Sequence, residues 1–181
     1  MISLRSKLVR KLLNYFFINP QEKLYVNEVS KKLDLDKRNL VKKLRELEQE
    51  GILKSERRGN LKLYSVNRRY YLYKEYKSTI LKTVGLEDRL RKIIQSTYGV
   101  REGYIYGSYV LGRMGIYSDV DLLVIGDHNI LELQRKLNQL QKEINREINI
   151  VNMSTREFKN RIKKRDTFIQ EIFNKKHIRL I

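Results

Sequence analysis

Residues 107–125, GSYVLGRMGIYSDVDLLVI, carry the most informative pattern in this sequence. They predict a strand that ends at Tyr106, a Gly-Ser turn, a short helical or looped crossing, and a second strand that ends at Ile125. Because side chains two residues apart share one face of a strand, Asp119 and Asp121 should point the same way. Two adjacent carboxylates repel each other, and a divalent metal ion is the usual remedy. The pattern therefore predicts a metal site at the start of the second strand.

The pair Gly107-Ser108 predicts a phosphate site beside these acids. A glycine at such a turn lets backbone N–H groups approach a phosphate closely, and the N-terminus of a following helix would add a favourable partial charge. The alternative is that Gly107 only turns the chain and that the two aspartates cap or solvate the strand end. We favour the binding interpretation, because an acidic pair at the entrance of an apolar strand is unfavourable unless something binds there.

This ordered pattern resembles the DNA polymerase β nucleotidyltransferase superfamily, in particular its minimal nucleotidyltransferases. The resemblance implies that Asp119 and Asp121 are catalytic acids that hold Mg²⁺ or Mn²⁺. It also implies a bound nucleoside triphosphate, with ATP as the expected nucleotide. The residues expected to bind the nucleotide are Gly107, Ser108, Gly112 and Ser118.

The superfamily typically carries a third acid on a later strand, and here Asn149 stands at the matching position. Asparagine is neutral and cannot accept a proton at neutral pH. Glu147, two residues earlier, shares the face of Asn149 and could replace the missing catalytic acid with a longer reach. Alternatively, Glu147 is an ordinary polar residue at a strand start. The resemblance thus leaves open whether the domain catalyses transfer or only binds nucleotide.

The composition limits the remaining possibilities. A chain of 181 residues allows one large domain or two small ones. Its apolar stretch at residues 12–18 is too short to span a membrane and is interrupted, so we expect an amphipathic helix in a cytoplasmic protein rather than a signal peptide. The absence of cysteine excludes disulfides, thiol chemistry and Cys-ligated zinc. Any metal must be held mainly by oxygen, which suits Mg²⁺ or Mn²⁺.

The net charge of +18 predicts a polyanionic partner, most simply nucleic acid. The excess is uneven along the chain. Residues 1–84 hold 21 Lys and Arg against 9 Asp and Glu, whereas residues 85–181 hold 18 against 12. The more basic half is therefore the N-terminal one.

That half predicts three helices followed by a β-hairpin. Helical spacing of apolar residues, beginning at Leu4, indicates a helix over residues 4–18, and Asn27 can cap a short second helix. Asp36 can cap a third helix with an apolar stripe at Leu40, Leu44 and Leu47. Residues 52–66 alternate and read as a hairpin with a basic tip.

Three helices and a hairpin form a winged helix-turn-helix, and residues 26–53 resemble the DNA-binding domains of ArsR-like and MarR-like regulators. The resemblance implies that the third helix enters the major groove of double-stranded DNA and that the hairpin contacts the backbone or minor groove. A palindromic target would make a homodimer the expected state. Alternatively, the third helix only has a solvated basic face, or the domain mediates protein contacts. The residues expected to face DNA are Lys37, Arg38, Asn39, Lys42 and Lys43 on the helix, and Arg57, Arg58 and Asn60 on the hairpin.

The expected fold class is α+β with two domains. A winged helix at residues 1–67 is joined by a connecting helix at 68–84 to a nucleotidyltransferase-like domain at 85–181, which has a small mixed sheet. Strands alternating with helices predict that helices cover one side of this sheet. The predicted elements of this domain are a helix at 86–98, strands at 103–106, 120–125 and 147–152, and helices at 130–145, 154–164 and 167–174.

Three functions are compatible with these features. The first is a DNA-binding transcriptional regulator whose second domain binds Mg²⁺ and nucleotide with reduced activity. The second is an active nucleotidyltransferase that moves a nucleoside monophosphate onto a protein, RNA or small-molecule acceptor. The third is an antitoxin-like partner of another protein.

Overall fold

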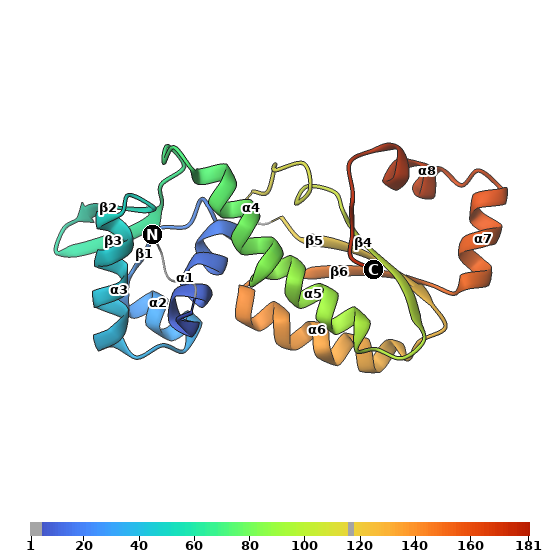
Figure 1. Ribbon diagram of the computed structural model, residues 1–181, viewed down its shortest axis with the longest axis horizontal. Helices are drawn as coiled ribbons and strands as arrows, with labels where there is room; N and C mark the ends of the chain where they lie inside the picture. Colours follow the sequence, from blue (N-terminus) through green and yellow to red (C-terminus); the bar gives the residue numbers. More distant parts are fainter. Residues whose placement is uncertain (1–4, 116–117) are drawn as a thin grey trace. The chain divides into compact units, whose positions relative to one another are not determined.

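The structure is a computed structural model that describes residues 5–115 and 118–181 (Figure 1). Leu4, expected at the start of the first helix, lies outside these residues. The chain divides into two compact units. The first unit extends to Asp88 and includes Glu143–Asn145, and the second comprises Arg89–Lys142 and Arg146–Ile181. None of the helices in the described residues is long and apolar enough to cross a membrane.

The first unit contains the predicted helices and hairpin. Its short strand β1 pairs with β3, which also pairs with β2, so that the sheet order is β1-β3-β2 and all pairs are antiparallel. Pairing of the hairpin runs from Leu53 with Val66 to Arg58 with Leu61. In chain order the elements are α1 (Lys7–Ile18), β1 (Leu24–Tyr25), α2 (Val26–Leu33), α3 (Lys37–Gln49), β2 (Leu53–Arg58), β3 (Leu61–Val66) and α4 (Tyr73–Thr83).

Helix starts in this unit follow capping chemistry, with one correction. Asp36 caps α3 as predicted, since its carboxylate accepts a hydrogen bond from the backbone N–H of Asn39 at 3.1 Å. The prediction that Asn27 caps α2 was wrong, because the helix begins at Val26. Glu28 instead reaches back and accepts from the backbone N–H of Tyr25 at 3.1 Å, and it thereby satisfies a backbone donor at the start of the helix.

The core of the first unit is built on α1. Its C-terminal half, from Leu12 to Ile18, is buried, including the rings of Phe16 and Phe17. The predicted stripe on α3 is confirmed, with Leu40, Leu44 and Leu47 at most 3% exposed. The helical spacing of apolar residues in the sequence therefore identifies the buried face of α3.

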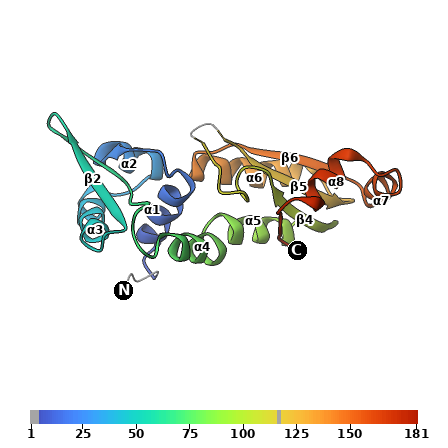
Figure 2. The ribbon, with the colours of Figure 1, turned by 90° about the horizontal axis from the view of Figure 1, so that it is seen from above.

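The second unit holds a four-stranded sheet in the order β6-β5-β4-β7. β5 and β6 are parallel, while β4 is antiparallel to both β5 and β7, so the sheet is mixed as predicted. α7 and α8 follow β6 and lie together, coloured orange to red in Figure 2. In chain order the elements are α5 (Leu86–Gln95), which begins in the first unit, β4 (Val100–Tyr106), β5 (Val120–Gly126), α6 (Ile130–Ile144), β6 (Ile148–Met153), α7 (Thr155–Lys163), α8 (Thr167–Asn174) and β7 (Ile178–Arg179).

Helices pack on both faces of this sheet, which corrects the expectation of one covered face. A side chain at Gly103 would meet Ile94 at 2.7 Å, so α5 packs closely on the face of Gly103. On the opposite face, Ile169 and Ile172 of α8 share a buried cluster with Leu123 of β5. The face under α8 is also that of Asp121, because Asp121 and Leu123 are two residues apart on one strand.

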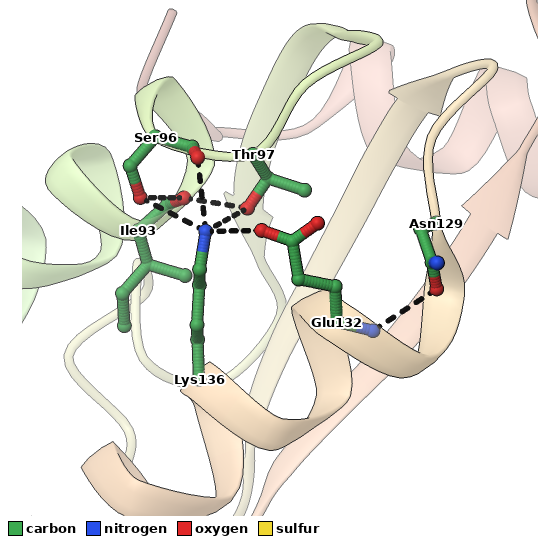
Figure 3. Close-up of polar contacts among 6 residues, drawn as sticks. All are labelled: Ile93, Ser96, Thr97, Asn129, Glu132 and Lys136. Atoms are coloured by element: carbon green, nitrogen blue, oxygen red, sulfur yellow. Dashed lines mark hydrogen bonds and ion pairs between the residues drawn. The ribbon is translucent and has the colours of Figure 1, made fainter.

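Lys136 of α6 closes the C-terminal end of α5 (Figure 3). Its ammonium donates to the backbone oxygen of Ser96 at 2.9 Å and to the side-chain oxygens of Ser96 and Thr97, both at 3.3 Å. Glu132, one turn earlier on α6, forms an ion pair with it at 2.7 Å. A cation at this position satisfies orphan carbonyl groups and complements the helix dipole.

We expect Lys136→Met to lower the free energy of unfolding by about 1 kcal/mol, because the apolar chain keeps its packing but loses the bonds to the end of α5. Urea denaturation monitored by circular dichroism measures the change. Lys142→Met, on the same helix outside this network, is the matched control. Equal stability of the two variants would contradict the capping role.

Candidate functional site

The Gly-Ser turn begins where β4 ends. Its backbone folds through successive turns, in which the N–H of Leu111 donates to Gly107 O at 3.3 Å and that of Arg113 to Ser108 O at 3.0 Å. Among the described residues of this crossing, 107–115, the backbone forms turns and no α-helix. Any anion here would therefore meet the backbone N–H groups of a turn, without the dipole of a helix.

Gly107 is required at this turn for two reasons. Its φ is +72°, a conformation that residues with a side chain rarely adopt. A Cβ atom at this position would also lie 2.2 Å from Oδ2 of Asp121. The missing side chain therefore lets the turn pass directly over the carboxylate, so that the predicted phosphate and metal positions are adjacent.

Three polar side chains meet at the start of β5 and β6. Asp121 pairs in register with Tyr106 on one side and with Asn149 on the other. The amide Nδ2 of Asn149 donates a hydrogen bond to Oδ2 of Asp119 at 2.9 Å. Burial and the negative charge of Asp119 raise the pKa of Asp121, and a hydrogen bond from Asn149 partly opposes the rise. The two carboxylates thus share a half-buried site, and the repulsion between them contributes to the raised pKa of Asp121.

Arg146 holds the chain that leads into this acidic pair. Its side chain is buried, and its Nη1 donates to the backbone oxygens of Gly115 at 2.8 Å and Ser118 at 2.7 Å. This role could not be predicted from the sequence, since Arg146 is one of 39 basic residues and matches no motif. Its contribution is to position Asp119, which directly follows Ser118.

Two residues predicted to bind the nucleotide, Gly112 and Ser118, lie between β4 and β5. The hydroxyl of Ser118 accepts a hydrogen bond from the N–H of Gly115 at 2.8 Å. Gly112 is exposed, has a φ of +67°, and has open space where a side chain would stand. Nucleotide contacts from these two residues stay predictions.

The structure does not bring Glu147 together with the aspartates. Glu147 is exposed and precedes β6, where its backbone oxygen accepts from the N–H of Val120 at 3.0 Å. Within residues 5–115 and 118–181, no group of three or more His, Asp or Glu side chains could hold a metal ion. Asn149 lies beside the acidic pair, so a substitute role for Glu147 stays a prediction.

A cavity of about 330 Å³ opens beside the Gly-Ser turn, on the face of the sheet under α8. We call it the α8 cavity. Burial, followed by the charge of Asp121, raises the pKa of the Tyr106 hydroxyl in its wall. The residues that line the cavity are Tyr106, Gly107, Ser108, Leu111, Arg113, Phe168, Glu171, Ile172, Lys175 and Lys176.

The first unit presents the residues predicted to face DNA. Lys37, Arg38, Asn39 and Lys42 on α3 are exposed, as are Arg57, Arg58 and Asn60 on the hairpin, whereas Lys43 is half-buried and paired with Glu46. Glu48 ties the hairpin to α3. It accepts hydrogen bonds from Lys62 and Ser55, which lower its pKa. The two basic surfaces are therefore held in one arrangement within this unit.

A mixed sheet with an acidic pair opposite a Gly-Ser turn defines a domain of the nucleotidyltransferase type. The chain belongs to the nucleotidyltransferase domain family, whose model matches residues 87–179. No curated protein matches the chain.

Two solved structures are distantly similar. One is described as a toxin–antitoxin with AMP-PNP, with 15% identity and a TM-score of 0.39, and the match covers 52% of this chain and 72% of that one. The other is a mutant of the toxin–antitoxin MntA-HpeT, with 13% identity, a TM-score of 0.39 and the same coverage of 52% and 72%. Likenesses this distant assign no nucleotide, partner or activity to this chain.

We expect Asp121→Asn to stabilise the fold at neutral pH. Because the pKa of Asp121 is raised in the folded state, its ionised form destabilises the native protein above that pKa. The gain should vanish as the pH falls below the ordinary pKa of aspartate, where the native carboxyl is protonated in both folded and unfolded chains. Thermal melting of the two proteins between pH 3 and 7, roughly the range over which Asp titrates, measures it. A gain that persists at the acidic end would contradict the charge-repulsion account.

Proposed function

We propose that this protein is a DNA-binding regulator whose nucleotidyltransferase domain binds a nucleoside triphosphate together with Mg²⁺. The observation that carries the nucleotide part is the contact between Gly107 and Asp121. A Cβ would lie 2.2 Å from the carboxylate oxygen, so the turn that offers N–H groups lies directly against the acidic pair. A triphosphate with its metal ion needs phosphate-binding N–H groups and metal-binding carboxylates beside each other.

The donor set fits a hard divalent cation. Asp119 and Asp121 provide carboxylate oxygens, which Mg²⁺ prefers, and their repulsion is a cost that a cation would remove. These two residues would hold the metal, with Asn149 orienting Asp119 through its hydrogen bond. When bound, Mg²⁺ would offset phosphate charge and polarise the phosphoryl group.

The neighbouring α8 cavity suits an anionic ligand. Gly107 and Ser108 form part of its wall, and the cations Arg113, Lys175 and Lys176 line it as well. Lysine and arginine are the usual partners of phosphate oxygens. The nucleotide would therefore place its phosphates between these cations and the acidic pair.

Asn149 is the reason for proposing reduced activity. Its amide points an N–H at Asp119, and an amide cannot remove a proton from an attacking hydroxyl. The second candidate, an active transferase, is favoured by membership of the family and by the intact acidic pair. The antitoxin-like role, a protein partner and a cytoplasmic location stay predictions from the sequence.

We expect Asn149→Asp to increase transfer of label from α-³²P-labelled nucleoside triphosphates to the protein, RNA or a cell extract. A positioned general base contributes on the order of 10²- to 10⁴-fold, which is the upper limit of the gain. The double variant Asp119→Asn with Asn149→Asp should transfer nothing, because the metal site is lost. Native transfer that matches Asn149→Asp and disappears in Asp119→Asn would establish the active-transferase alternative.

The DNA part of the proposal rests on the exposed basic residues of α3 and the hairpin. The proposed domains are a winged helix over residues 1–67, a connecting helix over 68–84 and a nucleotide-binding domain over 85–181. Two copies on a palindromic site would place two α3 helices about one helical turn of DNA apart. Nucleotide sensing would appear as a change in DNA affinity when Mg²⁺ and ATP are added, and an unchanged affinity would contradict it.

We expect the double variant Arg57→Ala and Arg58→Ala to weaken binding to all DNA sequences. Each lost phosphate contact should reduce the slope of log affinity against log salt by about 1, hence about 2 for the pair. Fluorescence anisotropy across a salt series measures the slope. Lys163→Ala with Lys164→Ala, an exposed basic pair of the second unit, is the matched control. A slope unchanged by the arginine substitutions would exclude the hairpin from the DNA interface.

A further inference from the structure

We propose that the α8 cavity takes the nucleoside part of the triphosphate, that Phe168 packs against the base, and that Glu171 selects bases that present N–H donors. The inference rests on the proposed function, because it places the phosphates at Gly107 and Ser108. It adds a base-recognition element on α8, a helix that lies outside the Gly-Ser and aspartate motifs.

The position of the cavity limits what it can hold. Gly107 and Ser108 form one part of its wall, and Phe168, Glu171 and Ile172 of α8 form another. A ligand anchored by phosphate at the turn therefore has its remaining atoms beside α8. The volume of about 330 Å³ lies at the lower end of the range for small-molecule sites, roughly 300–1,000 Å³.

Phe168 and Ile172 of α8, together with Tyr106 of β4, make one part of the wall apolar and aromatic. The rings of Phe168 and Tyr106 lie 6.0 Å apart at 86°, and both are partly buried against the core cluster that contains Ile172. Their remaining surface lines the cavity. Partly exposed aromatic surface of this kind suits the face or edge of a nucleobase, whereas a phosphate gains nothing from it.

The charges in the cavity distinguish a nucleotide from a simple polyphosphate. Arg113 and Lys176 suit phosphate, whereas Glu171, the one acid among the described lining residues, forms an ion pair with Lys175 and offers a phosphate only acceptor oxygens. Lys175 donates a hydrogen bond to Glu171, which lowers the pKa of Glu171 and keeps it ionised. A carboxylate accepts hydrogen bonds only and can accept more than the one from Lys175, so its natural ligand group here is an N–H of the base.

The experiment measures dissociation constants of the full-length protein for Mg²⁺ complexes by isothermal titration calorimetry. ATP is compared with purine riboside triphosphate, which lacks the 6-amino group, and GTP is compared with ITP, which lacks the 2-amino group. Inorganic tripolyphosphate is the probe without a nucleoside. We expect the native protein to prefer one amino-bearing nucleotide over its partner by roughly threefold to tenfold, since the amino group gives Glu171 a second hydrogen-bond donor beside Lys175. Glu171→Ala should abolish that preference and leave tripolyphosphate affinity unchanged or higher.

Phe168→Ala should weaken the binding of all nucleotides by about tenfold, because stacking of the base on the aromatic ring is lost, and should not change tripolyphosphate affinity. Phe168→Leu keeps the packing of α8 if the alanine variant is unstable. Two matched controls lie on α7. Phe158 packs against the same core cluster but does not line the α8 cavity, and Glu157 forms an i,i+4 ion pair with Arg161 as Glu171 does with Lys175. Phe158→Ala and Glu157→Ala should leave nucleotide affinities unchanged.

The outcomes separate the two proposals. Nucleotides that bind no tighter than tripolyphosphate, or a base preference that survives Glu171→Ala, would overturn the inference while the phosphate and metal site stands. Loss of binding in Asp119→Asn with retained binding in both α7 controls would support the proposed site. If neither nucleotide nor tripolyphosphate binds the native protein, the proposed function fails and the inference fails with it.

Discussion

The repulsion between Asp119 and Asp121 is the constraint on which the arrangement of the second unit depends. Burial and the charge of Asp119 raise the pKa of Asp121, so the site is unfavourable for the metal-free fold. The surrounding structure enforces the pair through β-sheet register on both sides of Asp121 and through the bonds of Arg146 to Gly115 and Ser118. An electrostatically unfavourable arrangement that rigid neighbours maintain is typical of binding sites.

The register explains how residues distant in sequence become one site. β4 brings Tyr106 beside Asp121, and β6 brings Asn149 to the other side. Since paired residues of neighbouring strands share a face, all three side chains lie on the face under α8. α8 packs on this face through Ile169 and Ile172, and the same packing places Phe168 and Glu171 at the cavity. The acidic pair and the α8 cavity therefore depend on one sheet face.

Local patterns were enough to predict much of this from the sequence. Period-two alternation predicted that Asp119 and Asp121 lie close together, and the charge of Asp119 does act on Asp121. Helical spacing predicted the buried stripe of α3. Features that depend on contacts between distant residues could not be predicted from local patterns, for a physical reason. An amphipathic pattern shows that α8 has an apolar side but does not show which sheet face it covers, and the role of Arg146 depends on loop carbonyls 28 and 31 residues away. The contact of Gly107 with Asp121 likewise exists only after β4 and β5 pair.

Asn149 is the position at which our proposal separates binding from catalysis. Asparagine is nearly isosteric with aspartate, so it keeps the strand register and fills the same space. Its N–H donates to Asp119, whereas an aspartate there would have added a third negative charge to an already strained pair. Compared with an aspartate, asparagine thus relieves the metal-free site and keeps Asp119 oriented, but it cannot accept a proton. In our proposal a regulatory domain needs the first two properties and an enzyme would need the third, so this position, more than the acidic pair itself, distinguishes the two proposed functions.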